Sequence, residues 1–150
     1  MGITVKNNVR LKEKFEARLQ AIEREMKVAI NDAQAGISIR TQGGSGVDGS
    51  SFAPYSETYK HVRADRGYQT GPVNLTVTGD MLRAITNAVD RFGQRIVGRI
   101  FFNRTSSVSP ITGKAASSVN KARWTNALRR WFGLSQQQRA TLKETLKNAR

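Results

Sequence analysis

The sequence predicts an α+β fold in which a long N-terminal amphipathic helix and further helices pack on a small, mainly antiparallel sheet. Three observations predict this fold: a helical apolar period over residues 8–35, an alternating β-branched and aromatic segment at residues 95–102, and a second helical pattern near the C-terminus. A chain of 150 residues is long enough for one domain. We therefore expect a single domain, 1–150, with mobile loops near 41–51 and 103–119.

The apolar residues between Asn8 and Ala35 recur at steps of three and four. They are Leu11, Phe15, Leu19, Ile22, Met26, Ile30 and Ala33. This spacing places them on one face of a helix. Charged residues lie between them, with Glu23 and Lys27 one turn apart on the solvated face. We expect Gly36 to end the helix and the alternation in residues 37–40 to form a short strand or edge segment.

The next segment, TQGGSGVDGSS at residues 41–51, is rich in glycine and serine. Its backbone entropy opposes one fixed conformation, which predicts a mobile loop. No Gly-Lys-Ser/Thr follows, so the loop is not a phosphate-binding loop. After it, Pro54 ends an extended approach, and Ser56 is placed to cap a short helix that runs through Tyr59 to Arg63.

The middle of the chain predicts strand, helix and strand in that order. Alternation over residues 73–77 indicates a strand or extended segment. Thr78, Gly79 and Asp80 then begin a helix that we expect to continue through Val89. A turn at residues 92–94 precedes the clearest strand signal, RIVGRIFF at residues 95–102.

The last third contains a long excursion and two helices. Residues 103–119 show little apolar periodicity, which is typical of a functional or disordered loop. Trp124, Leu128 and Trp131 follow at helical spacing, and we interpret them as core residues. After a break at Gly133, a capping box of Ser135 and Gln138 begins the terminal helix. Its apolar side comes from Leu142 and Leu146.

Positive charge is concentrated in the same third. The chain carries 25 Lys and Arg against 11 Asp and Glu, a net charge of +14. From Arg95 to Arg150 there are twelve basic residues and one acid, Glu144, so +11 of this charge lies in the last 56 residues. Such segregation predicts an anionic partner, either nucleic acid or an acidic protein face.

We expect the basic and aromatic residues of this third to form a partner or subunit contact, because arginine pairs with carboxylate or phosphate and stacks on rings. The candidates are Arg104, Lys114, Lys121, Arg123, Arg129, Arg130, Trp131 and Phe132. The alternative is that the two adjacent arginines only flank a buried aromatic residue.

Catalytic and metal-binding motifs are missing from the sequence. Cysteine is absent, which excludes disulfides and thiolate metal sites and fits a reducing cytosol. The one histidine, His61, falls within the short capped helix, and Asp80 is explained as a helix-start residue. We predict a protein that is not an enzyme, with no catalytic, cofactor-binding or metal-binding residues. Neither a signal peptide nor a membrane-spanning stretch is visible, so we expect no membrane partner.

Several short motifs occur in a recognisable order. An F-x-P-Y-S segment with a following tyrosine comes first, then an L-x-x-T-G-x-M element, a strand that ends on an aromatic residue, and a basic-aromatic-G-L-S motif before the last helix. The positions that carry this order include Phe52, Pro54, Tyr55, Ser56, Thr78, Gly79, Gly133 and Ser135. In this order the chain resembles the virion morphogenesis, or tail completion, proteins of tailed bacteriophages.

The resemblance implies a structural subunit that forms a ring at the head–tail junction (the neck) or at the tail end. Its expected partners are copies of itself, with a hexamer favoured, and the adjacent connector and tail proteins of the phage. Non-specific contact with packaged DNA is a further expectation. The implied location is the virion, after assembly in the cytoplasm of the bacterial host. The alternative is a nucleic-acid-binding protein that uses its basic C-terminal third.

Overall fold

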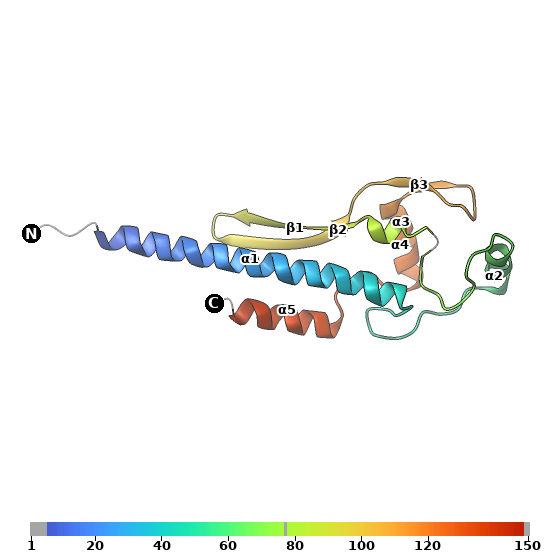
Figure 1. The fold of residues 1–150 in the computed structure, drawn as a ribbon, viewed down its shortest axis with the longest axis horizontal. Helices are drawn as coiled ribbons and strands as arrows, with labels where there is room; N and C mark the ends of the chain where they lie inside the picture. Colours follow the sequence, from blue (N-terminus) through green and yellow to red (C-terminus); the bar gives the residue numbers. More distant parts are fainter. Residues whose placement is uncertain (1–5, 77, 149–150) are drawn as a thin grey trace, which may run out of the picture.

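One helix, α1 (Lys6–Gln42), runs along most of the length of the molecule (Figure 1). The structure is a computed structural model and describes residues 6–76 and 78–148. A hairpin of β1 (Ile85–Phe92) and β2 (Arg95–Phe102) packs on one side of α1, and α5 (Gln136–Asn148) packs on another. The remaining elements gather around the C-terminal end of α1. The predicted α+β class is confirmed.

The predicted end of α1 is wrong, because the helix continues for six residues beyond Gly36. Residues 37–40 are therefore helical and not a strand, and Ile37 is buried in the core. Gly36 has another role: a Cβ atom at this position would overlap the side-chain amide nitrogen of Gln138. The glycine thus allows α5 to lie close to α1.

The hairpin confirms the strand predicted at residues 95–102 and the turn before it. The register runs from Ile85 opposite Phe102 to Phe92 opposite Arg95, around a turn that contains Gly93 with a φ of 62°. The helix predicted through Val89 is wrong. Helix α3 (Asp80–Arg83) stops after four residues, and the following segment pairs with β2 instead.

A second, smaller hairpin occupies part of the predicted excursion at residues 103–119. It consists of β3 (Ser106–Val108) and β4 (Ala115–Ser117), and α4 (Ser118–Leu128) begins directly after it. The prediction of a long irregular segment is therefore wrong in part. Ser117 caps α4 by accepting a hydrogen bond from the backbone N–H of Asn120 at 3.2 Å.

Ser56 caps α2 (Glu57–Ala64) as predicted, since its hydroxyl accepts a hydrogen bond from the backbone N–H of Tyr59. The strand or extended segment predicted at residues 73–77 does not form over residues 73–76, where Leu75 has a φ of 52°, and residue 77 lies outside the described residues. Val73 is nonetheless buried, so this irregular segment contributes to the core.

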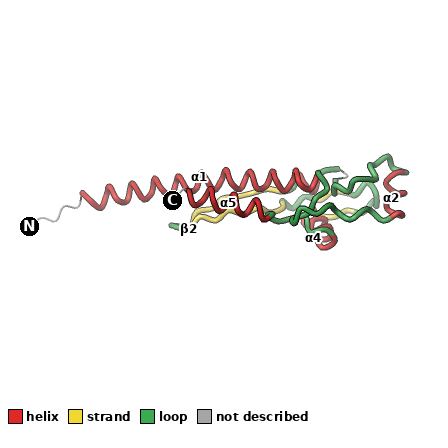
Figure 2. The backbone as a smooth tube through the Cα atoms, turned by 90° about the horizontal axis from the view of Figure 1, so that it is seen from below, coloured by secondary structure: helices red, strands yellow, loops and turns green. Residues whose placement is uncertain are grey.

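The capping box of α5 is confirmed. The Ser135 hydroxyl accepts from the backbone N–H of Gln138 at 3.2 Å, and the Gln138 side chain accepts from the backbone N–H of Ser135 at 2.9 Å. From this start, α5 runs antiparallel to α1 along its middle part (Figures 1 and 2).

The core lies where α1, α3, α4 and the base of the hairpin meet. Its buried members are Ile37, Met81, Leu82, Ile85, Ala122 and Trp131. The loop that follows α1 is tied to this region, because the backbone N–H of Val47 donates to the carbonyl of Arg130 at 2.8 Å and that of Phe52 donates to Gly44 at 2.7 Å.

Candidate interaction surfaces

The candidate contact residues of the basic third lie at one end of the molecule, around α4 and the small hairpin (Figure 1). Arg104 precedes β3, Lys114 lies between β3 and β4, and Lys121 and Arg123 are on α4. Three other basic residues, Arg139, Lys143 and Lys147, lie on α5 instead. Arg150 is outside the described residues. Arg95 and Arg99 are on β2. The fold therefore divides the basic third among the region around α4, α5 and the first hairpin.

Two of the candidates have contacts within the chain. The Lys121 ammonium donates to the backbone carbonyl of Ser107 at 2.8 Å, which joins α4 to β3. The Arg129 guanidinium lies 5.6 Å from the ring centroid of Tyr55 and donates to the carbonyl of Ala53 at 3.4 Å. Both side chains are half-buried, and these contacts give them a role in holding the fold.

Trp131 has no exposed surface at all, with a relative accessibility of 0%. Its ring packs edge-on against Phe102 at 5.8 Å, and its indole N–H donates to the Thr125 hydroxyl at 3.0 Å. Phe132 is half-buried against the same Phe102 ring. The prediction that Trp131 is a contact residue is therefore wrong in this fold. The alternative describes the position better, because Trp131 is a buried aromatic residue beside Arg130.

The other two aromatic and apolar positions of that helical pattern are on the surface. Trp124 is 59% exposed and Leu128 is 77% exposed, so the prediction that they belong to the core is wrong. The buried side of α4 consists of small residues, Ser118 and Ala122. Trp124 and Leu128 are four residues apart, so they form an apolar pair on the outer side of α4.

Arg104, Lys114, Arg123 and Arg130 are exposed, and none of them makes an ion pair within the described residues, although the charge of Arg130, after hydrogen bonds from Ser50, contributes to lowering the pKa of Asp48. Trp124 is exposed in the same region, so the exposed residues around α4 and the small hairpin are both basic and aromatic. This is the composition expected of a surface that contacts phosphate groups or a protein.

The family-motif positions mainly have structural roles in turns, helix caps and core packing. Tyr55 is buried, and the guanidinium of the buried Arg63 lies 4.7 Å from its ring centroid. Thr78 donates to the Asp80 carboxylate at 2.6 Å, and this hydrogen bond, followed by that of Arg83, lowers the pKa of Asp80. The remaining positions have related roles: Phe52 packs on the core, Pro54 is exposed before α2, Gly79 has a φ of 76° at the start of α3, and Ser135 caps α5.

Arg40 is a connecting residue that the sequence did not indicate. Its guanidinium donates to the Gln138 side chain at 2.7 Å, to the carbonyl of Trp131 at 3.0 Å and to the carbonyl of Gly133 at 2.8 Å. Burial lowers the pKa of Arg40. The side chain joins the end of α1 to the segment that leads into α5.

The N-terminal part of α1 projects beyond the elements that cover the rest of the helix (Figure 2). Every residue from Val9 to Arg18 is exposed, and we call this stretch the arm. It carries the first two members of the apolar stripe, Leu11 at 63% exposure and Phe15 at 48%. The third member, Leu19, is buried. The stripe thus continues beyond the part of α1 that the fold covers.

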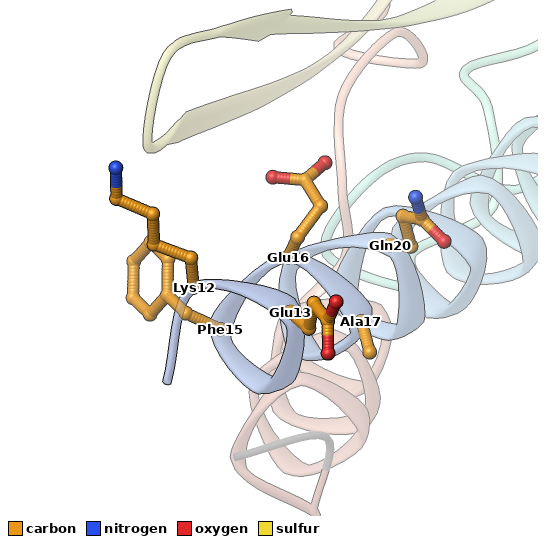
Figure 3. Close-up of a pocket in the computed structure, with 6 residues that line it drawn as sticks. All are labelled: Lys12, Glu13, Phe15, Glu16, Ala17 and Gln20. Atoms are coloured by element: carbon orange, nitrogen blue, oxygen red, sulfur yellow. The ribbon is translucent and has the colours of Figure 1, made fainter. Parts of the chain in front are cut away.

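The hairpin makes its last contact with α1 at the edge of the arm. Arg91 donates to the Glu16 carboxylate at 2.7 Å, and this hydrogen bond lowers the pKa of Glu16. In Figure 3, Glu16 extends toward the hairpin, whereas Phe15 projects from the helix closer to its N-terminus. The pocket shown there is lined by residues of α1 alone, so no second helix or strand encloses it.

A groove of about 260 Å³ lies between α1 and α5. From α1 it is lined by Val28, Ala29, Asp32, Ala33 and Gly36, and from α5 by Gln137, Gln138, Thr141, Leu142 and Thr145. Asp32 is the one charged residue among them. Three of the five residues that line it from α1 are small, namely Ala29, Ala33 and Gly36.

Within the described residues, no three His, Cys, Asp or Glu side chains come together in a group that could hold a metal ion. None of the helices in that part of the chain combines the length and the apolar composition needed to cross a bilayer. No family model, curated protein or solved structure matches the chain. The resemblance to tail completion proteins therefore stays a prediction.

Proposed function

We propose that this chain is a structural subunit of a tailed-phage particle, and that copies of it join into a ring at the head–tail junction or at the tail end. One observation carries the proposal: the chain leaves two unlike apolar surfaces uncovered in separate regions. They are the arm with Leu11 and Phe15, and the outer face of α4 with Trp124 and Leu128.

Exposed apolar side chains that gather on one surface favour contact with another protein. Subunits that join head to tail around an axis need two different complementary patches on each copy. A chain with two unlike patches meets this requirement, and the order of the family motifs supports the same assignment. We expect the adjacent connector and tail proteins of the phage to cover the apolar side chains that the contacts within the ring leave exposed.

The mass of the purified protein in solution tests the proposal. Sedimentation over a range of concentrations is expected to give one closed oligomer, with six copies favoured. Peptides of the chain are also expected in purified particles of the phage whose genome encodes it. A protein that stays monomeric at all concentrations and is missing from particles would remove the proposal.

A second function, binding of nucleic acid, is favoured by the exposed cationic residues beside Trp124. Arg104, Lys114 and Arg123 make no ion pair among the described residues, and exposed cations of this kind neutralise phosphates. Retention on duplex DNA is then expected to fall with salt, with a log-log slope of about 0.9 for each phosphate neutralised. Absence of retention at low salt rules this function out.

A further inference from the structure

The arm and the α1–α5 groove are matching halves of one contact. The arm presents Leu11 and Phe15, which are both exposed, and the groove presents five small or apolar residues and five polar residues between two helices. A cavity of about 150 Å³ holds a benzene ring, so a groove of about 260 Å³ has room for the ring of Phe15. An amphipathic helix in an apolar groove is a common mode of recognition.

The charges of the arm and of the groove also favour contact between the two. Arg10, Lys14 and Arg18 recur every four residues, so they form a basic row beside the apolar side chains of the arm. None of the three makes an ion pair within the described residues. The charged residue that lines the groove is an acid, Asp32, which also makes no ion pair there.

The basic residues of α5 do not oppose this arrangement. The groove is lined on the α5 side by Gln137, Gln138, Thr141, Leu142 and Thr145, and none of these is charged. Arg139, Lys143 and Lys147 lie on the part of α5 that does not line the groove. An incoming basic row therefore meets a polar and apolar lining with one carboxylate.

The arm cannot reach the groove of its own chain. Phe15 and Asp32 are both on α1, and a separation of 17 residues on a continuous helix corresponds to about 25 Å along its axis. Contact between them requires two molecules. A second copy of the chain supplies both halves, and the contact repeats because each copy offers a free arm and a free groove.

We propose that the arm of one copy docks in the α1–α5 groove of a second copy, with Phe15 in the groove and the basic row beside Asp32. This inference rests on the proposed function and specifies the contact by which copies join. It predicts a head-to-tail contact, since the two halves differ. A symmetric contact of arm with arm would bring two basic rows together.

Cross-linking tests the contact directly, because the chain has no cysteine of its own. Phe15→Cys and Val28→Cys are made as separate single variants, and the two are mixed under mild oxidation. A cross-linked dimer is expected in the mixture, and each variant alone is expected to stay unlinked. A dimer of Phe15→Cys with itself would overturn the inference in favour of arm-to-arm contact.

Assembly of a charged variant gives the second readout. Phe15→Asp is expected to weaken self-association by at least about tenfold, because it replaces the ring that enters the groove with a carboxylate that has to lose its hydration there, beside the carboxylate of Asp32. Phe15→Leu is the matched control: it changes the same position but keeps an apolar side chain for the groove, and it is expected to assemble nearly as the unmodified chain does. Circular dichroism checks that both variants keep their helices.

The outcomes separate this inference from the proposed function. An oligomer that forms without the mixed cross-link, and that tolerates Phe15→Asp, overturns the docking of the arm but leaves a ring subunit. A monomer at every concentration overturns both.

Discussion

Gly36 provides a sharp test of the packing between α1 and α5. Alanine is about 1 kcal/mol better than glycine inside an exposed helix, so Gly36→Ala would stabilise a free helix. Here the added Cβ overlaps the Gln138 side chain, which therefore has to leave its position. Whether Gly36→Ala raises or lowers the free energy of unfolding depends on the hydrogen bonds that Gln138 loses in this movement.

Gln138 makes two long-range hydrogen bonds that the movement removes. It accepts from the Arg40 guanidinium at 2.7 Å, and a bond to a charged group contributes about 1.5–3 kcal/mol. It also donates to the carbonyl of Ala33 at 3.1 Å, which contributes about 0.5–1.5 kcal/mol. After subtraction of the gain in helix propensity, Gly36→Ala is expected to lower the free energy of unfolding by about 1–3.5 kcal/mol.

Urea denaturation followed by circular dichroism measures this difference. The control is the same substitution in a Gln138→Ala background, where the obstacle is gone and Gly36→Ala is expected to stabilise by up to about 1 kcal/mol. Stabilisation by that amount in the unmodified chain would refute the close approach of α5 at Gly36.

Three further predictions concern single side chains. Trp131→Ala is expected to cost about 3–5 kcal/mol of stability and Trp124→Ala less than about 1 kcal/mol, measured by thermal melting; similar losses would contradict the opposite burial of the two rings. Arg63→Ala is expected to cost about 2–4 kcal/mol in urea, with Arg63→Met recovering at least half, because methionine fills the site without a buried charge; no recovery would assign the loss to the guanidinium contacts. The hydrogen bond from Arg91 holds the pKa of Glu16 below its ordinary value, so this pair stabilises the fold above the ordinary pKa and ceases to do so as pH falls through the lowered pKa. The stability difference between the unmodified chain and Glu16→Gln is therefore expected to shrink between pH 7 and pH about 3, and a difference that stays constant would exclude the pair as its source.

The long helix could be predicted because its apolar stripe is continuous, and Leu19, Ile30 and Ala33 are buried along it as the spacing indicates. Its end could not be predicted from Gly36. A glycine is favoured both at a helix end and where two helices approach closely, and only the packing of α5 decides between these roles. The sequence also gives no signal for where the covering elements stop, so the free arm appears only in the fold.

Only the second strand of the first hairpin was predicted, and the residues of β1 show why the first strand was not. Ile85 and Val89 are four residues apart, and this spacing places them on one face of a helix but also, because it is even, on one face of a strand. Eight residues of pairing with β2 decide for the strand. The alternation of β2 itself, with Arg95 and Arg99 exposed, was visible in the sequence.

The aromatic residues of the last third could not be sorted from sequence alone. The spacing of Trp124, Leu128 and Trp131 predicted one buried helical face, but α4 ends at Leu128 and the backbone of Arg129 is extended. Trp131 therefore lies off the helix and reaches the core, whereas the first two remain on the surface. The sequence shows that positive charge is concentrated in the last third of the chain. Only the fold shows that the basic residues of α5 lie apart from those around α4.

We have proposed that copies of this chain join head to tail into a closed ring. A low-resolution electron microscopy image of the purified protein tests it most directly. We expect ring-shaped particles of one size with cyclic symmetry, and we expect Phe15→Asp to reduce their number strongly while Phe15→Leu does not. Isolated monomers, or dimers related by a single two-fold axis, would contradict it.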